Sequence, residues 1–114
     1  MPVKVDRRRF EDLVEKALDG LPAEVEAMLD NVVVMVTDGR LGDPLGQYQG
    51  VPLTARGQYG MMEMPDRITI YRVPLCDHAR DEDHLVEEVR ITVVHELGHH
   101  LGSDDDRLHD LGYG

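Results

Sequence analysis

The chain is organised around residues 81–102, which read DEDHLVEEVRITVVHELGHHLG. Apolar residues recur in this stretch at every fourth position, a spacing that is typical of one buried face of a helix. These residues are Leu85, Val89, Val93, Leu97 and Leu101. Asp81, Glu82 and Asp83 precede them, where acids stabilise the positive end of a helix dipole. The pattern therefore predicts a long helix that begins near Asp81, packs against the core and ends at Gly102.

Two histidines in this predicted helix, His95 and His99, stand one turn apart. At about 100° per residue they lie about 40° apart around the helix axis, so both imidazoles can ligate one metal ion. Glu96 falls about 60° from His99, where its carboxylate can reach a water molecule on that ion without ligating the ion. The spacing therefore predicts a metal site with Glu96 as a general base beside it.

Asp105 is the candidate third metal ligand, and His109 is the alternative. Gly102 follows His99 by three residues and could adopt a positive φ, which would let the helix end and the chain turn back toward the histidines. Two imidazoles and one carboxylate would leave a fourth position open, as catalytic zinc sites require. We therefore expect Zn²⁺ to be held by the two helical histidines and one residue that follows the helix.

Other polar residues could support this site. Glu88, Asp104 and Asp106 are candidate partners for the ligand imidazoles, because metal-bound histidines usually donate their other N–H group to a carboxylate or a carbonyl. Each of these acids could instead be a solvated surface residue. Arg72 or Tyr113 could stabilise an oxyanion, although spacing alone gives no geometry for either residue.

At these positions the chain resembles the zincin metallopeptidases. Their signature, H-E-x-x-H, is matched by His95, Glu96 and His99. The longer pattern H-E-x-x-H-x-x-G-x-x-H/D is also matched, with Gly102 and Asp105 in its last two places. The resemblance implies that Asp105 replaces the third histidine of the metzincin form.

The resemblance covers most of the chain, whose layout looks like a family of small bacterial minimal-zincin proteins. It implies a zinc-dependent metallopeptidase that hydrolyses bonds in a peptide or protein substrate. The chain departs from the metzincins because all six methionines precede residue 65, so their methionine turn is not matched. We also expect no C-terminal subdomain to wall a deep cleft. The predicted site is therefore shallow and open.

Patterns before the long helix predict two helices and several short strands. The helices are expected over residues 6–19, with Asp6 as the cap, and 22–29, and the strands over 31–37, 46–50, 59–64 and 67–73. The Val-rich strand 31–37 is expected to be central and buried on both faces. Pro74 is expected to end the last strand. We therefore predict an α+β fold, with one zincin-like domain over residues 1–114, a small mixed sheet, N-terminal helices and a long helix that carries the H-E-x-x-H motif.

The net charge of −11 disfavours polyanionic partners. Residues 81–114 alone hold ten acidic residues against two arginines, so nucleic acid and anionic membranes would be repelled. Cys76 is the only cysteine, which excludes an internal disulfide. The N-terminal residues lack the apolar core of a signal peptide, and no apolar run is long enough to cross a membrane. We therefore expect a cytoplasmic protein.

Three functions are consistent with these patterns. The first is a zinc-dependent peptidase, in which an edge strand above the long helix pairs with an extended peptide and Glu96 is the catalytic residue. The second is a catalytically weak or inactive zinc-binding protein whose metal is structural or regulatory. The third is a protein-interaction module whose histidines bind no metal. A stoichiometric zinc ion would exclude the third function, and the effect of Glu96→Gln would separate the first two.

Overall fold

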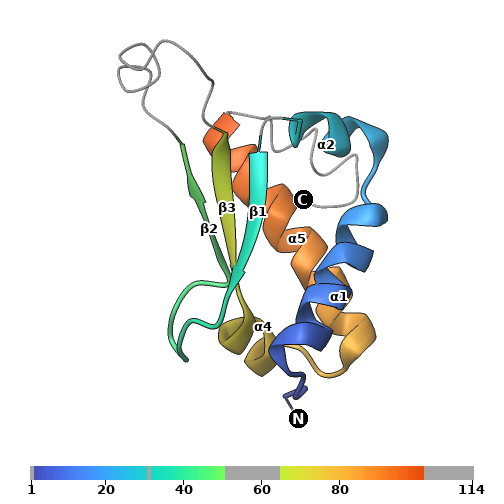
Figure 1. Cartoon of the computed structure of the whole chain (residues 1–114), viewed down its shortest axis with the longest axis vertical. Coiled ribbons are helices and arrows are strands. Elements are labelled where there is room, and N and C mark those ends of the chain that lie inside the picture. Colours follow the sequence, from blue (N-terminus) through green and yellow to red (C-terminus); the bar gives the residue numbers. More distant parts are fainter. Residues whose placement is uncertain (1, 31, 51–64, 102–114) are drawn as a thin grey trace.

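The computed structural model of the protein describes residues 2–30, 32–50 and 65–101, with the helical backbone alone for residues 99–101. A small sheet lies against the long helix α5 (Glu82–Leu101), and α1 (Arg7–Asp19) packs along the same helix (Figure 1). The short helix α2 (Ala23–Met28) lies near one end of the molecule, and α4 (Arg72–His78) lies near the other end beside the N-terminus (Figure 1). The predicted α+β class is confirmed.

The sheet contains three strands within the described residues. They are β1 (Val32–Thr37), β2 (Gly46–Gln49) and β3 (Asp66–Tyr71), in the spatial order β1-β3-β2. β1 runs parallel to β3, and β2 runs antiparallel to it. The sheet is therefore mixed, as predicted, and β3 is its central strand.

The prediction that the Val-rich strand is central and buried on both faces is wrong. Among the described strands β1 lies at an edge of the sheet, and its side chains alternate between the core and solvent, with Val33 and Met35 each 43% exposed. The central position belongs to β3, in which Ile68 and Ile70 are fully buried. A run of β-branched residues fits a pleated strand at either position. Its composition therefore predicts the strand correctly without predicting how many neighbours the strand has.

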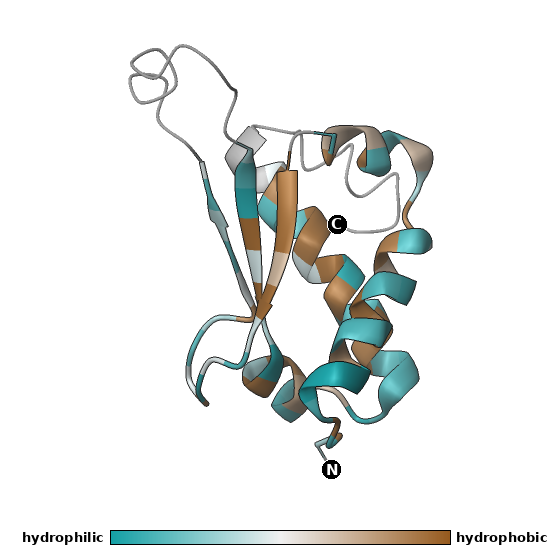
Figure 2. Cartoon of the chain, in the orientation of Figure 1, coloured by the Kyte–Doolittle hydropathy of each residue, from teal (hydrophilic) through white to brown (hydrophobic). Residues whose placement is uncertain are grey.

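The two N-terminal helices form where they were predicted. The Arg9 backbone N–H donates to the Asp6 carboxylate at 2.8 Å, which caps the first turn of α1. An apolar face of α1 is buried from Phe10 to Ala17, and α2 buries Val25. Figure 2 shows hydrophobic residues of α1 on the side that faces α5, with hydrophilic residues on the opposite side. The periodicity of the sequence therefore identified both helices and their buried faces.

The helix α4 was not predicted. Strand β3 ends at Tyr71, two residues before the predicted end, and α4 begins at Arg72. Pro74 is the third residue of α4 and is buried. The first-turn N–H groups of a helix have no partner within the helix, so proline costs little there. Pro74 therefore lies inside the start of a helix, whereas we expected it only to terminate a strand.

The long helix α5 forms as predicted. The His84 backbone N–H donates to the Asp81 carboxylate at 2.8 Å, which caps the helix. The predicted apolar stripe is buried through Leu97. The side chain of Leu101, the helix end at Gly102 and the predicted strand 59–64 lie outside the described residues. Four of the five predicted apolar positions are therefore buried. The face that they form packs against the sheet and α1.

Candidate active site

His95 and Glu96 line one groove on the surface of α5. Both side chains are half-buried, and each directly follows or precedes a buried residue of the helix, Val94 or Leu97. The groove has a volume of about 200 Å³. Its walls come from two segments, α5 and the residues that lead into β2. The lining residues are Pro44, Leu45, Gly46, Glu88, Ile91, Thr92, His95 and Glu96.

Gly46 sets the distance between β2 and α5. It is buried and pairs with Ile70 of β3, and a Cβ atom built on it would lie only 2.5 Å from the Thr92 side-chain methyl carbon. The Thr92 hydroxyl donates to the Glu88 carbonyl at 2.8 Å, and its side chain is the only buried polar one in the described part of the chain. Glycine therefore allows the strand backbone to lie directly on the helix, one turn before His95.

β2 borders this groove through its first residue, Gly46. Within residues 32–50 and 65–101, β2 pairs with β3 alone. The Tyr48 hydroxyl donates to the Asp66 carboxylate at 2.6 Å, and the Tyr71 hydroxyl donates to the Gln47 side chain at 3.0 Å. These bonds hold β2 on the sheet. A strand edge that no second strand covers can offer backbone groups to an extended peptide.

Glu88, the candidate partner of a ligand imidazole, contacts two other histidines. Its carboxylate lies 3.1 Å from His84 Nε2 and 3.5 Å from His78 Nε2. The Arg80 backbone N–H donates to His84 Nδ1 at 3.0 Å, so the ring hydrogen is on Nε2, which donates to Glu88. Glu88 therefore anchors the turn between α4 and α5, a role that the four-residue spacing of His84 and Glu88 could have indicated.

The structure does not describe the side chains of the other predicted metal ligands. The backbone of His99 is on the helical turn that follows His95, but its side chain, Asp105 and His109 lie outside the described residues. In residues 2–30, 32–50 and 65–98, no three side chains of histidine, cysteine, aspartate or glutamate form a metal-binding group. His95 does present an imidazole at a groove with Glu96 beside it, and imidazole and carboxylate donors suit zinc. The described part of the donor set therefore fits the metal that the motif implies.

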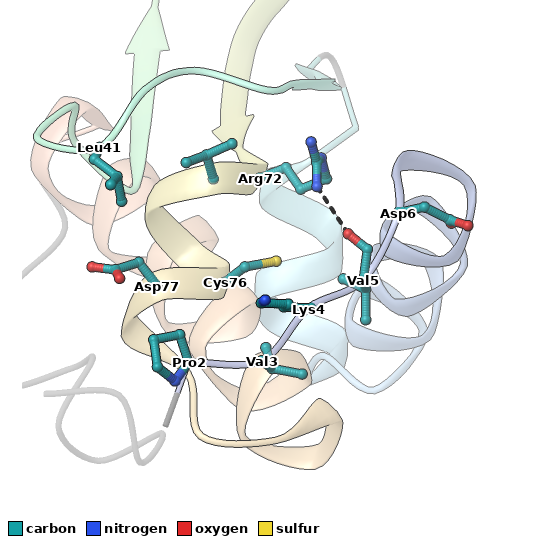
Figure 3. A pocket seen from close by; sticks show the side chains of 10 residues that line it. Pro2, Val3, Lys4, Val5, Asp6, Leu41, Arg72, Cys76 and Asp77 are labelled. Atoms are coloured by element: carbon teal, nitrogen blue, oxygen red, sulfur yellow. Dashed lines mark hydrogen bonds between the residues drawn. The ribbon is translucent and has the colours of Figure 1, made fainter.

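A larger cavity, of about 480 Å³, lies between the N-terminal segment and α4 (Figure 3). Neither His95 nor Glu96 lines it. Arg72 lines it and donates to the Val5 carbonyl and to the Asp38 carboxylate, each at 2.8 Å. Arg72 therefore does not serve the groove as an oxyanion donor. Burial raises the pKa of the Cys76 thiol in the same cavity, which makes it a poor nucleophile. The larger cavity thus lacks the chemistry that the groove offers.

Comparison with known proteins shows the family of this chain. The family model of the zincin-like metallopeptidases matches residues 18–114, so the chain belongs to the zincin-like metallopeptidase family. The match confirms the predicted family and supports a zinc-binding hydrolase at the level of the family. No curated protein matches the sequence.

The fold is also similar to that of a solved structure, a conserved hypothetical protein from Thermus thermophilus. The two chains are 25% identical, with a TM-score of 0.54, and the alignment covers 86% of this chain and 95% of the other. None of the helices in the described residues combines the length and apolar character of a membrane span.

Proposed function

We propose that this chain is a zinc-dependent peptidase in which Glu96 is the general base and His95, His99 and Asp105 hold the metal. The observation that carries the proposal is that His95 and Glu96 line the same groove, whose opposite wall includes Gly46, the first residue of β2. Family membership supports the metal and the class of reaction. The groove supplies what the motif alone lacks, which is a surface where a substrate can lie against both residues.

The metal ion and Glu96 would have different roles in the reaction. When bound, Zn²⁺ supplies Lewis acidity, which polarises a carbonyl group and makes a water molecule acidic near neutral pH. A Glu96 carboxylate oxygen then accepts the proton of the attacking water and later delivers it to the departing amine nitrogen. Because Glu96 is half-buried in the groove, a bound peptide would exclude much of the competing bulk water from it.

The edge of β2 would orient the substrate. An extended peptide that pairs with this edge gains backbone hydrogen bonds regardless of its sequence. Gly46 holds the strand close to α5, so a peptide on the edge would run beside the turn that carries His95. The main chain of the substrate would therefore be positioned by β2, and its side chains would meet the walls of the groove.

Digestion of an unbiased peptide library tests the proposal. We expect zinc-loaded wild type to cleave and Glu96→Gln to keep one equivalent of zinc while losing at least about 100-fold in rate, because general-base catalysis contributes about 10²–10⁴-fold. Glu87→Gln is the matched control, since Glu87 is on the same helix but is exposed and pairs with Arg90. Equal cleavage by wild type and Glu96→Gln would contradict the proposal.

A second candidate is a zinc protein whose metal is structural or regulatory. The groove favours it in one respect, because a volume of about 200 Å³ is below the roughly 300–1,000 Å³ of most small-molecule sites. For this function, zinc removal would lower the melting temperature sharply, whereas Glu96→Gln would change neither stability nor any cellular readout. The same variant therefore separates the two candidates.

A further inference from the structure

The groove holds a carboxylate at each end. Glu96 lies at the end with His95, and Glu88 lies two helical turns earlier on α5, with a side chain that is 15% exposed. Between them the walls are largely apolar and are formed by Pro44, Leu45 and Ile91. The described lining of the groove contains no lysine or arginine. A side chain bound here would therefore meet an apolar channel with negative charge at its far end.

We propose that the groove selects peptide substrates with a lysine or arginine side chain next to the scissile bond, and that Glu88 determines this specificity. The inference rests on the proposed peptidase function. Lysine and arginine combine an apolar stem with a cationic head, which is the pattern that the groove complements. Neither a short polar side chain nor an acidic one satisfies both parts of this surface.

The separation of Glu88 and His95 along α5 is close to the reach of a long side chain. His95 lies seven residues after Glu88, which corresponds to about 10.5 Å along the helix axis. An extended lysine side chain spans about 6 Å from Cα to Nζ, as standard bond lengths give. A charge-assisted hydrogen bond adds about 2.8 Å, so the side chain and the bond together cover about 9 Å of this distance. A lysine whose Cα lies on the Glu88 side of His95 therefore comes within reach of the Glu88 carboxylate. Leucine or methionine would fill the channel and leave the carboxylate without a cation.

Glu88 is held in place for such a role. His84 Nε2–H donates to one carboxylate oxygen, and His78 Nε2 lies 3.5 Å from the other. Because the Arg80 backbone N–H donates to His84 Nδ1, it is His84 Nε2 that faces the Glu88 carboxylate. A carboxylate has about four lone-pair sites, so oxygen sites remain for an incoming ammonium or guanidinium group. The carboxylate is therefore positioned before a substrate binds.

The test compares two peptide libraries that differ at one fixed position, with lysine in the first and the uncharged norleucine in the second. We expect wild type to cleave the lysine library about tenfold faster, a difference typical of one charge-assisted hydrogen bond. Glu88→Gln keeps an acceptor for His84 but removes the charge, and it should reduce the preference to twofold or less. Glu87→Gln, the exposed neighbour, should leave the tenfold preference intact.

A binding measurement separates this inference from the proposed peptidase function. Glu96→Gln and the double variant Glu88→Gln/Glu96→Gln are titrated with the lysine peptides and with the norleucine peptides, and the NMR signal of the Ile91 methyl group reports occupancy of the groove.

The outcomes separate the two proposals. If the lysine peptides bind more tightly than the norleucine peptides and this difference depends on Glu88, the inference is supported, even if wild type cleaves nothing and the peptidase function fails. Cleavage with no lysine preference, or with a preference that survives Glu88→Gln, overturns the inference and leaves the peptidase function intact. Equal binding of both peptides in the absence of cleavage also overturns it.

Discussion

The two edge strands of the sheet differ in composition and in what they border. β1 reads VVVMVT and has the stronger strand propensity, yet it exposes Val33 and Met35 to solvent. β2 reads GQYQ, and its first residue, Gly46, is buried against α5 beside the groove. The strand with the weaker propensity therefore forms the wall of the candidate site. In this fold the site forms where a strand backbone can approach a helix closely, because the strand residue there has no side chain.

Gly46→Ala should have the largest effect, because it tests the close approach of β2 to α5, which β1 lacks. The added Cβ would lie 2.5 Å from the Thr92 methyl carbon and 3.2 Å from the Thr69 carbonyl oxygen. We expect a loss of about 1–3 kcal/mol in the free energy of unfolding, as for other overpacked sites. Urea denaturation measures this loss, and peptide cleavage should fall as β2 moves away from α5.

Thr92→Ser provides the control for that substitution. Serine removes the obstructing methyl group and keeps the hydroxyl that donates to the Glu88 carbonyl. The double variant Gly46→Ala/Thr92→Ser should therefore recover at least half of the lost stability. No recovery would show that the contact with Thr92 does not set the distance between β2 and α5.

Tyr48→Phe should have a smaller effect on the same edge. It removes the hydroxyl that donates to the half-buried Asp66 carboxylate at 2.6 Å, which should cost about 1 kcal/mol in urea denaturation. Tyr71→Phe is the matched control, because its hydroxyl bonds to Gln47 at an exposed position. We expect Tyr71→Phe to cost less than about 0.5 kcal/mol. A larger cost for Tyr71→Phe than for Tyr48→Phe would contradict this account of what holds β2.

The smallest expected effect is on the pH dependence of the melting temperature, and it concerns Asp38, just after the end of β1. Asp38 directly follows β1, and the hydrogen bond from Arg72 lowers the pKa of its carboxyl group. A carboxyl group with a lowered folded-state pKa stabilises the fold above its ordinary pKa, and this stabilisation is lost as the pH falls through the lowered value. Melting temperatures at about pH 6 and about pH 3 should therefore differ slightly less in Asp38→Asn than in wild type. An identical or larger difference in Asp38→Asn would contradict the assignment.

Most of the fold could be predicted from local patterns. The helical periodicity and the caps at Asp6 and Asp81 predicted α1 and α5, and both caps form. The position of β1 in the sheet could not be predicted, because it depends on which strands pair with β1, and the burial of its second face depends on what packs against that face. The helix α4 was missed because Pro74 ends a strand and is also tolerated in the first helical turn.

The candidate site could be predicted in part. The spacing of His95 and Glu96 placed both residues on one side of α5, and both line the groove. The opposite wall was missed because the contact between Gly46 and Thr92 joins positions 46 residues apart in sequence. A glycine in a glycine-rich segment indicates a turn as readily as a close approach to a helix. The roles of His99 and Asp105 as metal ligands stay predictions.

The continuity of α5 has a consequence for hydrogen exchange. The helical turn that carries His95 and Glu96 also carries Val93, Val94 and Leu97, which are at most 1% exposed. Local opening of this turn would expose that part of the core, so its amide hydrogens should exchange only through the largest unfolding events of the protein. We therefore expect His95 and Glu96 to belong to the most slowly exchanging unit, so that a ligand in the groove would meet a backbone that does not rearrange to receive it.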